Sequence, residues 1–105
     1  MKINNHDING VLEIDRIVHE PARLLILSYL SAVEYCDFIF LIKHTSFTKG
    51  NLSSHLRKLE DHGYVDVEKK IVDRKMNTVI KITETGREEL SRYKAYMMKH
   101  LESII

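Results

Sequence analysis

The chain of 105 residues contains a single cysteine, Cys36, so no disulfide bond can form within it. A lone thiol is typical of a protein from a reducing compartment. No apolar run approaches the roughly 18 residues that a membrane-spanning helix requires. The first ten residues, MKINNHDING, also lack the apolar centre of a signal peptide. Together these absences predict a cytoplasmic protein that does not enter the membrane.

Features that mark a multidomain chain or an enzyme are missing as well. There is no internal repeat, low-complexity tract or linker rich in Gly, Pro or Ser, so residues 1–105 are predicted to form one domain. There is no glycine-rich phosphate loop, nucleophile elbow or HExxH motif. We interpret carboxylate pairs such as Glu60-Asp61 as solvated faces, and predict neither catalysis nor a cofactor.

The net charge is only +1, which does not by itself indicate a polyanionic partner. The charges are unevenly distributed, however, because residues 46–81 contain eight Lys and Arg against five acidic residues. A cluster of cations in one segment favours contact with phosphate groups.

Hydrophobic periodicity predicts two helices near the N-terminus. An amphipathic helix is expected over residues 8–18, with Asp7 as its cap. A helix that is apolar almost all round, PARLLILSYL, is expected over residues 21–30 and should lie in the core. Pro21 suits its first turn, where a missing N–H costs nothing. Residues 33–36 are interpreted as extended.

Two further helices are predicted from their caps. Asp37 is the expected N-cap of a short helix, FIFLIKH, over residues 38–44. After a short break, Thr48 is the expected cap of a helix that ends near Asp61, with Gly63 at a position typical of helix ends.

After this glycine the period changes from 3.6 to 2, which indicates strands. Strands are predicted over residues 64–72 and 78–83, joined by a polar loop, Asp73–Asn77, that carries two cations. A last helix is predicted from Glu84 to Ile104. This order predicts a mainly α fold with a small β-hairpin (α+β), the winged helix-turn-helix.

The helix after Thr48 has two different faces. Leu52, Leu56 and Leu59 share one face at 100° per residue, and His55 lies at its edge, where we expect it to hydrogen-bond the backbone. The opposite face is small near its start and cationic further along, with Gly50, Ser54, Arg57 and Asp61 flanked by Asn51, Ser53 and Lys58. An ordinary solvated face is the alternative. The preceding helix and the following hairpin favour DNA, whose major groove admits such a helix.

The stretches HEPARLLILSYL, NLSSHLRKLEDHGYV and ITETGREEL resemble the small stand-alone winged-helix regulators of archaea and bacteria, which are relatives of the MarR and ArsR transcription factors. The resemblance covers residues 19–93. It implies a homodimer that binds double-stranded operator DNA, with the third helix in the major groove and the hairpin on the backbone or minor groove. By position, the implied DNA-binding residues are Thr48, Lys49, Asn51, Ser53, Ser54, Arg57, Arg74 and Lys75. A small-molecule effector is compatible with this family, although no residue identifies one.

The last helix carries an apolar seam at spacings of 3, 4, 4 and 3. Its members are Leu90, Tyr93, Met97, Leu101 and Ile104. Such a heptad-like seam packs either on the domain's own core or against a second copy. We favour dimerisation through the two terminal helices, 8–18 and 84–104, and note that Tyr96 and Met98 lie off the seam, where they would suit an interface pocket.

One cysteine and six histidines raise the question of a metal site. The segment EYCD resembles in outline the cysteine motif of ArsR-type sensors, but those motifs offer paired thiolates. A buried, inert Cys36 and no metal are therefore predicted. The favoured function is a sequence-specific DNA-binding regulator that acts as a homodimer on an inverted repeat. The alternative is a winged-helix module that binds protein or RNA.

Overall fold

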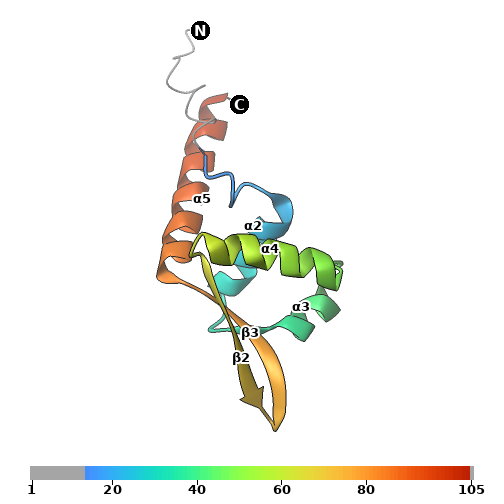
Figure 1. Cartoon of the computed structure of the whole chain (residues 1–105). Coiled ribbons are helices and arrows are strands. Elements are labelled where there is room, and N and C mark those ends of the chain that lie inside the picture. Colours follow the sequence, from blue (N-terminus) through green and yellow to red (C-terminus); the bar gives the residue numbers. More distant parts are fainter. Residues whose placement is uncertain (1–13, 105) are drawn as a thin grey trace.

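Figure 1 shows the computed structural model, which describes residues 14–104. The helices are α2 (Pro21–Ser31), α3 (Phe38–His44), α4 (Lys49–Asp61) and α5 (Glu84–Ile104). The strands are β1 (Cys36–Asp37), β2 (Val65–Val72) and β3 (Lys75–Ile82). Helices that enclose the base of a small antiparallel sheet confirm the predicted winged helix-turn-helix fold.

Side-chain caps begin the four described helices, and at α5 the Thr83 hydroxyl accepts from the N–H of Gly86 at 2.9 Å. Thr48 caps α4 and Asp37 caps α3, each by accepting hydrogen bonds from backbone N–H groups of the first turn, as predicted. Pro21 occupies the first turn of α2, also as predicted. The cap of α2 is Glu20, whose carboxylate accepts from two first-turn amides. The sequence did not single out this residue, because Glu is not a typical N-cap.

The three strands form an antiparallel sheet with β3 between β1 and β2. The pairing of β2 with β3 runs from Val65 opposite Ile82 to Val72 opposite Lys75. The extended segment predicted over residues 33–36 is shorter and later in the structure, since only Cys36 and Asp37 pair with β3.

The hairpin turn differs from the prediction. The expected loop over residues 73–77 is reduced to Asp73 and Arg74, and Lys75 already belongs to β3. Both turn residues have positive φ, 51° and 66°. A two-residue turn with both φ values positive matches the twist of the flanking strands, which allows the ladder to continue to the tip.

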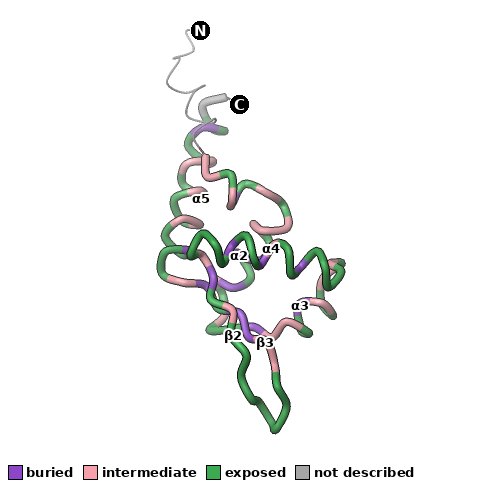
Figure 2. The backbone as a smooth tube through the Cα atoms, viewed as in Figure 1, coloured by how far each residue is buried: buried purple, intermediate pink, exposed green. Residues whose placement is uncertain are grey.

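The core lies between α2, α4 and the base of the sheet. Its buried side chains include Val18, Ile26, Leu27, Leu30, Leu41, Leu52, Leu56, Leu59, Val65, Ile80 and Ile82. Figure 2 shows buried segments (purple) in α2, α4 and the base of the sheet, while the hairpin tip is exposed. Burial of each large aliphatic side chain stabilises the fold by roughly 1.5–3 kcal/mol. The three leucines of α4 are all buried, which confirms the predicted core face of that helix.

Residues 14–18 form a turn and not the end of the helix predicted over residues 8–18. The Asp15 carboxylate accepts hydrogen bonds from the N–H groups of Ile17 and Val18 and closes this turn. Such local bonds compete with helical hydrogen bonding, which is why the pattern of apolar residues was misleading here. Asp7 and residues 8–13 lie outside the described residues.

Candidate nucleic-acid interface

The turn between α3 and α4 fixes the position of α4. The Thr45 hydroxyl donates to the carbonyl oxygen of Leu41 and accepts from the N–H of Phe47 at 3.3 Å. Phe47 packs against the core and its ring lies 6.3 Å from that of His55 on α4. Local hydrogen bonds and one aromatic anchor therefore set the angle at which α4 leaves the turn.

The outer face of α4 is exposed over its full length. Asn51, Ser53, Ser54 and Arg57 are all exposed, opposite the buried leucines. Thr48 and Lys49 at the start of the helix are exposed too. The Thr48 hydroxyl accepts from the N–H of Asn51 at 3.1 Å, so it is left with a hydrogen to donate. The DNA contacts of these residues stay a prediction.

The cations of this surface are not neutralised by neighbouring acids. Within residues 14–104, no ion pair involves Lys49, Arg57, Arg74 or Lys75. The hairpin formed by β2 and β3, which we call the wing, carries the last two of these cations at its exposed tip. Unpaired cations on one surface attract a polyanion without first breaking an internal contact.

A surface hollow of about 300 Å³ lies between α4 and the wing. Its lining residues are Phe38, Ser53, Leu56, Arg57, Glu60, Val67 and Thr78. Two of the predicted DNA-binding residues, Ser53 and Arg57, therefore meet the wing residues Val67 and Thr78 around one concavity. The sequence did not identify these wing residues, since their position depends on how the sheet packs against α4.

A polar cluster joins α4 to the start of α2. The His55 Nδ1 atom lies 3.3 Å from an Arg23 guanidinium nitrogen and 3.6 Å from a Glu20 carboxylate oxygen. His55 is at the edge of the core as predicted, but these partners are side chains and not backbone groups. Burial alone would raise the pKa of Glu20, but hydrogen bonds from the N–H groups of Arg23 and Ala22, with the charges of His55 and Arg23, hold it below its usual value.

The apolar seam of α5 is divided between two environments. Leu90 and Tyr93 pack against the domain's own core, and the Tyr93 hydroxyl lies 2.7 Å from the Nδ1 atom of His19. Met97 is half-buried, whereas Leu101 is 42% exposed on the part of α5 that extends beyond the body of the domain (Figure 1). The side chain of Ile104 lies outside what the structure describes. Dimerisation through this seam stays a prediction.

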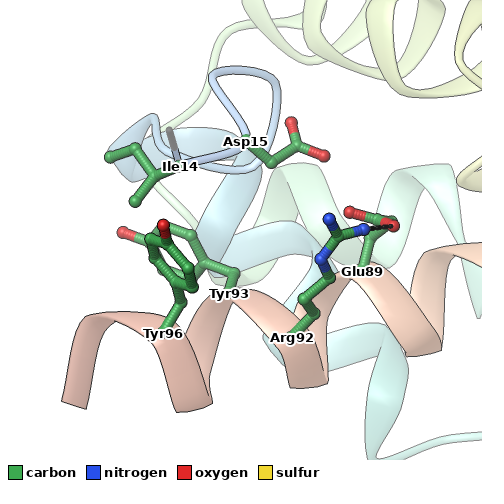
Figure 3. Close-up of a pocket in the computed structure, with 6 residues that line it drawn as sticks. All are labelled: Ile14, Asp15, Glu89, Arg92, Tyr93 and Tyr96. Atoms are coloured by element: carbon green, nitrogen blue, oxygen red, sulfur yellow. Dashed lines mark hydrogen bonds and ion pairs between the residues drawn. The ribbon is translucent and has the colours of Figure 1, made fainter. Parts of the chain in front are cut away.

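A second hollow, of about 280 Å³, lies between α5 and the segment before α2 (Figure 3). Its lining residues are Ile14, Asp15, Glu89, Arg92, Tyr93 and Tyr96. The two tyrosine rings lie beside Ile14, while Arg92 and Glu89 form an ion pair of 3.2 Å along the helix. One end of the hollow is therefore aromatic and the other is charged.

Asp15 connects this second hollow to the base of the wing, because its carboxylate accepts a hydrogen bond from the Tyr64 hydroxyl. Burial alone would raise the pKa of Asp15. The hydrogen bonds from Tyr64 and from the N–H groups of Val18 and Ile17 outweigh burial and lower that pKa below its usual value.

Cys36 is buried, as predicted. Burial raises the pKa of its thiol, and the negative charge of the neighbouring Asp37 raises it further. In the described part of the chain, no group of three or more His, Cys, Asp or Glu side chains is placed to hold a metal ion. No helix over the same residues has the length and apolar character needed to cross a bilayer.

The sequence of this chain is similar to those of known proteins. Residues 22–101 match the profile of a family described as winged helix DNA-binding domain. The chain is 38% identical over 78 residues to the uncharacterized protein MJ0432 of Methanocaldococcus jannaschii, a match that covers 74% of this chain and 85% of the relative.

Solved structures share the fold. A transcriptional regulator homologue from Pyrococcus horikoshii OT3 has a TM-score of 0.84 at 31% identity, over 94% of this chain and 97% of that one. The transcriptional repressor CouR, bound to a 23-mer DNA duplex, has a TM-score of 0.71 at 20% identity, over 93% and 66% of the two chains. Regulators of the MarR and ArsR families are also among the structural neighbours, in agreement with the predicted resemblance.

Proposed function

We propose that this chain, which belongs to the winged helix DNA-binding domain family, is a transcriptional regulator that binds a specific sequence in double-stranded DNA. The observation that carries the proposal is the exposed polar face of α4, which presents Asn51, Ser54 and Arg57 opposite the buried leucines. These side chains are available for binding because α4 packs on the core through its opposite face, where Leu52, Leu56 and Leu59 are buried.

The chemistry of this face suits the edges of base pairs. The major groove of B-DNA is wide enough for an α-helix, and small residues such as Gly50 and Ser54 allow a close approach. The Arg57 guanidinium can donate two hydrogen bonds to O6 and N7 of guanine, and the Asn51 amide can pair with N6 and N7 of adenine. Each such pair contributes roughly 1–3 kcal/mol of discrimination between bases.

The wing adds contacts that position the domain without reading the DNA sequence. Arg74 and Lys75 lie at the exposed tip, where unpaired cations bind phosphate groups or enter the minor groove. The two ends of the interface therefore have different tasks, base readout on α4 and backbone contact on the wing.

The relatives support this proposal. The Pyrococcus homologue is described as a transcriptional regulator homologue, and the repressor CouR was solved on a DNA duplex. If this chain reads DNA with α4, the face that would meet the bases is the one that is exposed in its structure.

The functional unit proposed is a homodimer that forms through α5. Leu101 and the neighbouring Met98 are exposed on the part of the helix that extends beyond the core, and a second copy would cover them. A two-fold dimer places its two recognition helices about one DNA turn apart, roughly 34 Å. The operator is accordingly expected to be an inverted repeat.

The test is selection of binding sites from a pool of random duplexes, with the DNA upstream of the protein's own gene as a second probe. We expect one enriched sequence with two-fold symmetry, bound at least about a thousand times more tightly than random duplex at physiological salt. Equal affinity for all duplexes would contradict sequence-specific regulation. Absence of any DNA binding would favour the protein- or RNA-binding alternative.

A further inference from the structure

The tip of the wing carries three exposed large apolar side chains that lie outside the core cluster, and Ile71 and Met76 are the most exposed of them. Ile71 is 72% exposed and Met76 is 64% exposed. They are direct partners across the two strands, so they form one apolar ridge and not two isolated side chains. Figure 2 shows the whole tip exposed. Because projecting hairpins are normally protected by charged residues, an apolar ridge at this position indicates a contact surface.

The ridge faces the same side of the hairpin as the hollow beside α4. Alternate residues of a strand share a face, so Ile71 shares a face with Val67, and Met76 with Thr78. Val67 and Thr78 line the hollow together with Arg57 of α4. The surface that would meet DNA therefore continues from α4 through the hollow to this ridge.

The surroundings of the ridge are cationic. The flanking cations are Lys69, Lys70, Arg74 and Lys75. The acids nearest in the chain are Asp73 and Glu68, of which Glu68 is already paired with Lys70 at 3.2 Å. An apolar centre with a cationic rim fits a ligand that is apolar inside and anionic outside. Double-stranded DNA has this character where a base step opens toward the minor groove, because the apolar faces of the bases then lie between two rows of phosphates.

We propose that the Ile71–Met76 ridge enters the minor groove next to the major groove that receives α4, and acts there as a wedge that partly unstacks one base step and bends the duplex. This inference rests on the proposed function. Apolar wedges of Ile, Leu, Phe or Met bend DNA by roughly 20–90° in other minor-groove proteins. The unbranched Met side chain adapts to an irregular gap, and flexible pyrimidine–purine steps are the steps that unstack most easily.

The experiment measures the bend of a selected duplex by energy transfer between dyes at its two ends. The test variant is Ile71→Thr with Met76→Thr, which keeps residues compatible with a strand but removes the apolar ridge. The matched control is Val72→Thr, the same kind of change at the same tip, since Val72 is 38% exposed and lies on the opposite face. Melting temperature checks that both variants fold.

We expect wild type and Val72→Thr to bend the duplex, and the double variant to bind it more weakly and to lose most of the bend. A double variant that bends the duplex as wild type does would overturn the inference and leave the proposed function intact. The inference is likewise overturned if the double variant changes only self-association, or only binding to vesicles of anionic lipid. If wild type binds no duplex at all, the proposed function fails and the wedge fails with it.

Discussion

At the scale of single residues, Gly86 illustrates how closely the first turn of α5 approaches the start of β2. A Cβ atom at this position would overlap with the carbonyl oxygen of Tyr64. That oxygen is held in place, because it accepts a hydrogen bond from the N–H of Thr83 at 3.0 Å. The tightest contact is therefore with the backbone, which cannot move aside as the nearby Ile82 side chain could.

Replacement of Gly86 by Ala should lower the free energy of unfolding by about 1–3 kcal/mol or more, as for other overpacked sites. The matched control is Gly50→Ala, because nothing lies within 4 Å of a Cβ built at Gly50 in α4. This control should be stabilising by about 0.4–1 kcal/mol, since alanine narrows the unfolded ensemble. Urea denaturation measures both values. Similar stability of the two variants would show that the backbone around Gly86 shifts to accept a Cβ atom without loss of stability.

Asp15 is expected to make the stability of the fold depend on pH. The pKa of its carboxyl is lower in the folded chain than the ordinary value of an aspartate, so ionised Asp15 stabilises the fold at any pH above that ordinary value. The contribution is lost as the pH falls from about 4 through the folded pKa. We expect Asp15→Asn to be less stable than wild type at neutral pH, and the difference to shrink in acid.

Stability curves measured from about pH 7 down to about pH 3 test this expectation. Asp66→Asn is the control, because Asp66 is exposed and should show no such trend. If Asp15→Asn lost the same amount of stability at every pH in this range, the charge of Asp15 would not be the source of its stabilising effect.

For single residues, the sequence predicted some roles and could not predict others. The caps at Asp37 and Thr48 were predictable, because Asp and Thr are preferred N-cap residues and each precedes a segment with helical spacing of apolar residues. The partners of His55 were not, since they come from the start of α2, whose placement against α4 depends on the whole core. Arg74 was identified as a cation at the tip, but its positive φ was not.

At the scale of elements, the wing is expected to hold the DNA backbone. Replacement of Arg74 and Lys75 by Ala should weaken binding to specific and random duplexes alike. The slope of log affinity against log salt concentration should become flatter by about one to two units. The reason is that binding releases about one counterion fewer for each phosphate contact that is lost. Replacement of Lys94 and Lys99, which are exposed on α5, is the matched control. Titrations over a series of salt concentrations measure the slopes, and an unchanged slope in the wing variant would exclude backbone contact there.

Periodicity predicted the elements better than their partners. The change of period after Gly63 correctly indicated strands, and the wheel of α4 correctly separated core from surface. It could not show that the hairpin ladder continues to Lys75, because the polar tip residues resemble a loop. Nor could it show that Leu90 and Tyr93 pack on their own core, since a heptad-like seam is the same whichever surface covers it.

At the scale of the whole molecule, the proposed dimer depends on the distal part of α5. Sizing by light scattering should give about twice the chain mass of 12.3 kDa. Leu101→Glu should shift the protein to monomer, because burying an unpaired carboxylate costs several kcal/mol. Ala95→Glu places the same charge on another exposed side of the helix and should leave the dimer intact. A wild-type monomer at micromolar concentration would contradict the dimer.

The central claim is that α4 reads bases, and the ratio of specific to non-specific DNA affinity tests it most directly. Arg57→Ala and Asn51→Ala should keep the melting temperature, because both side chains are exposed, but lower the ratio at least about five-fold. Arg57→Lys keeps the charge without the planar fork, so it should lose specificity while retaining most non-specific affinity. Affinities that fall equally on both duplexes, or do not change at all, would contradict base readout by this helix.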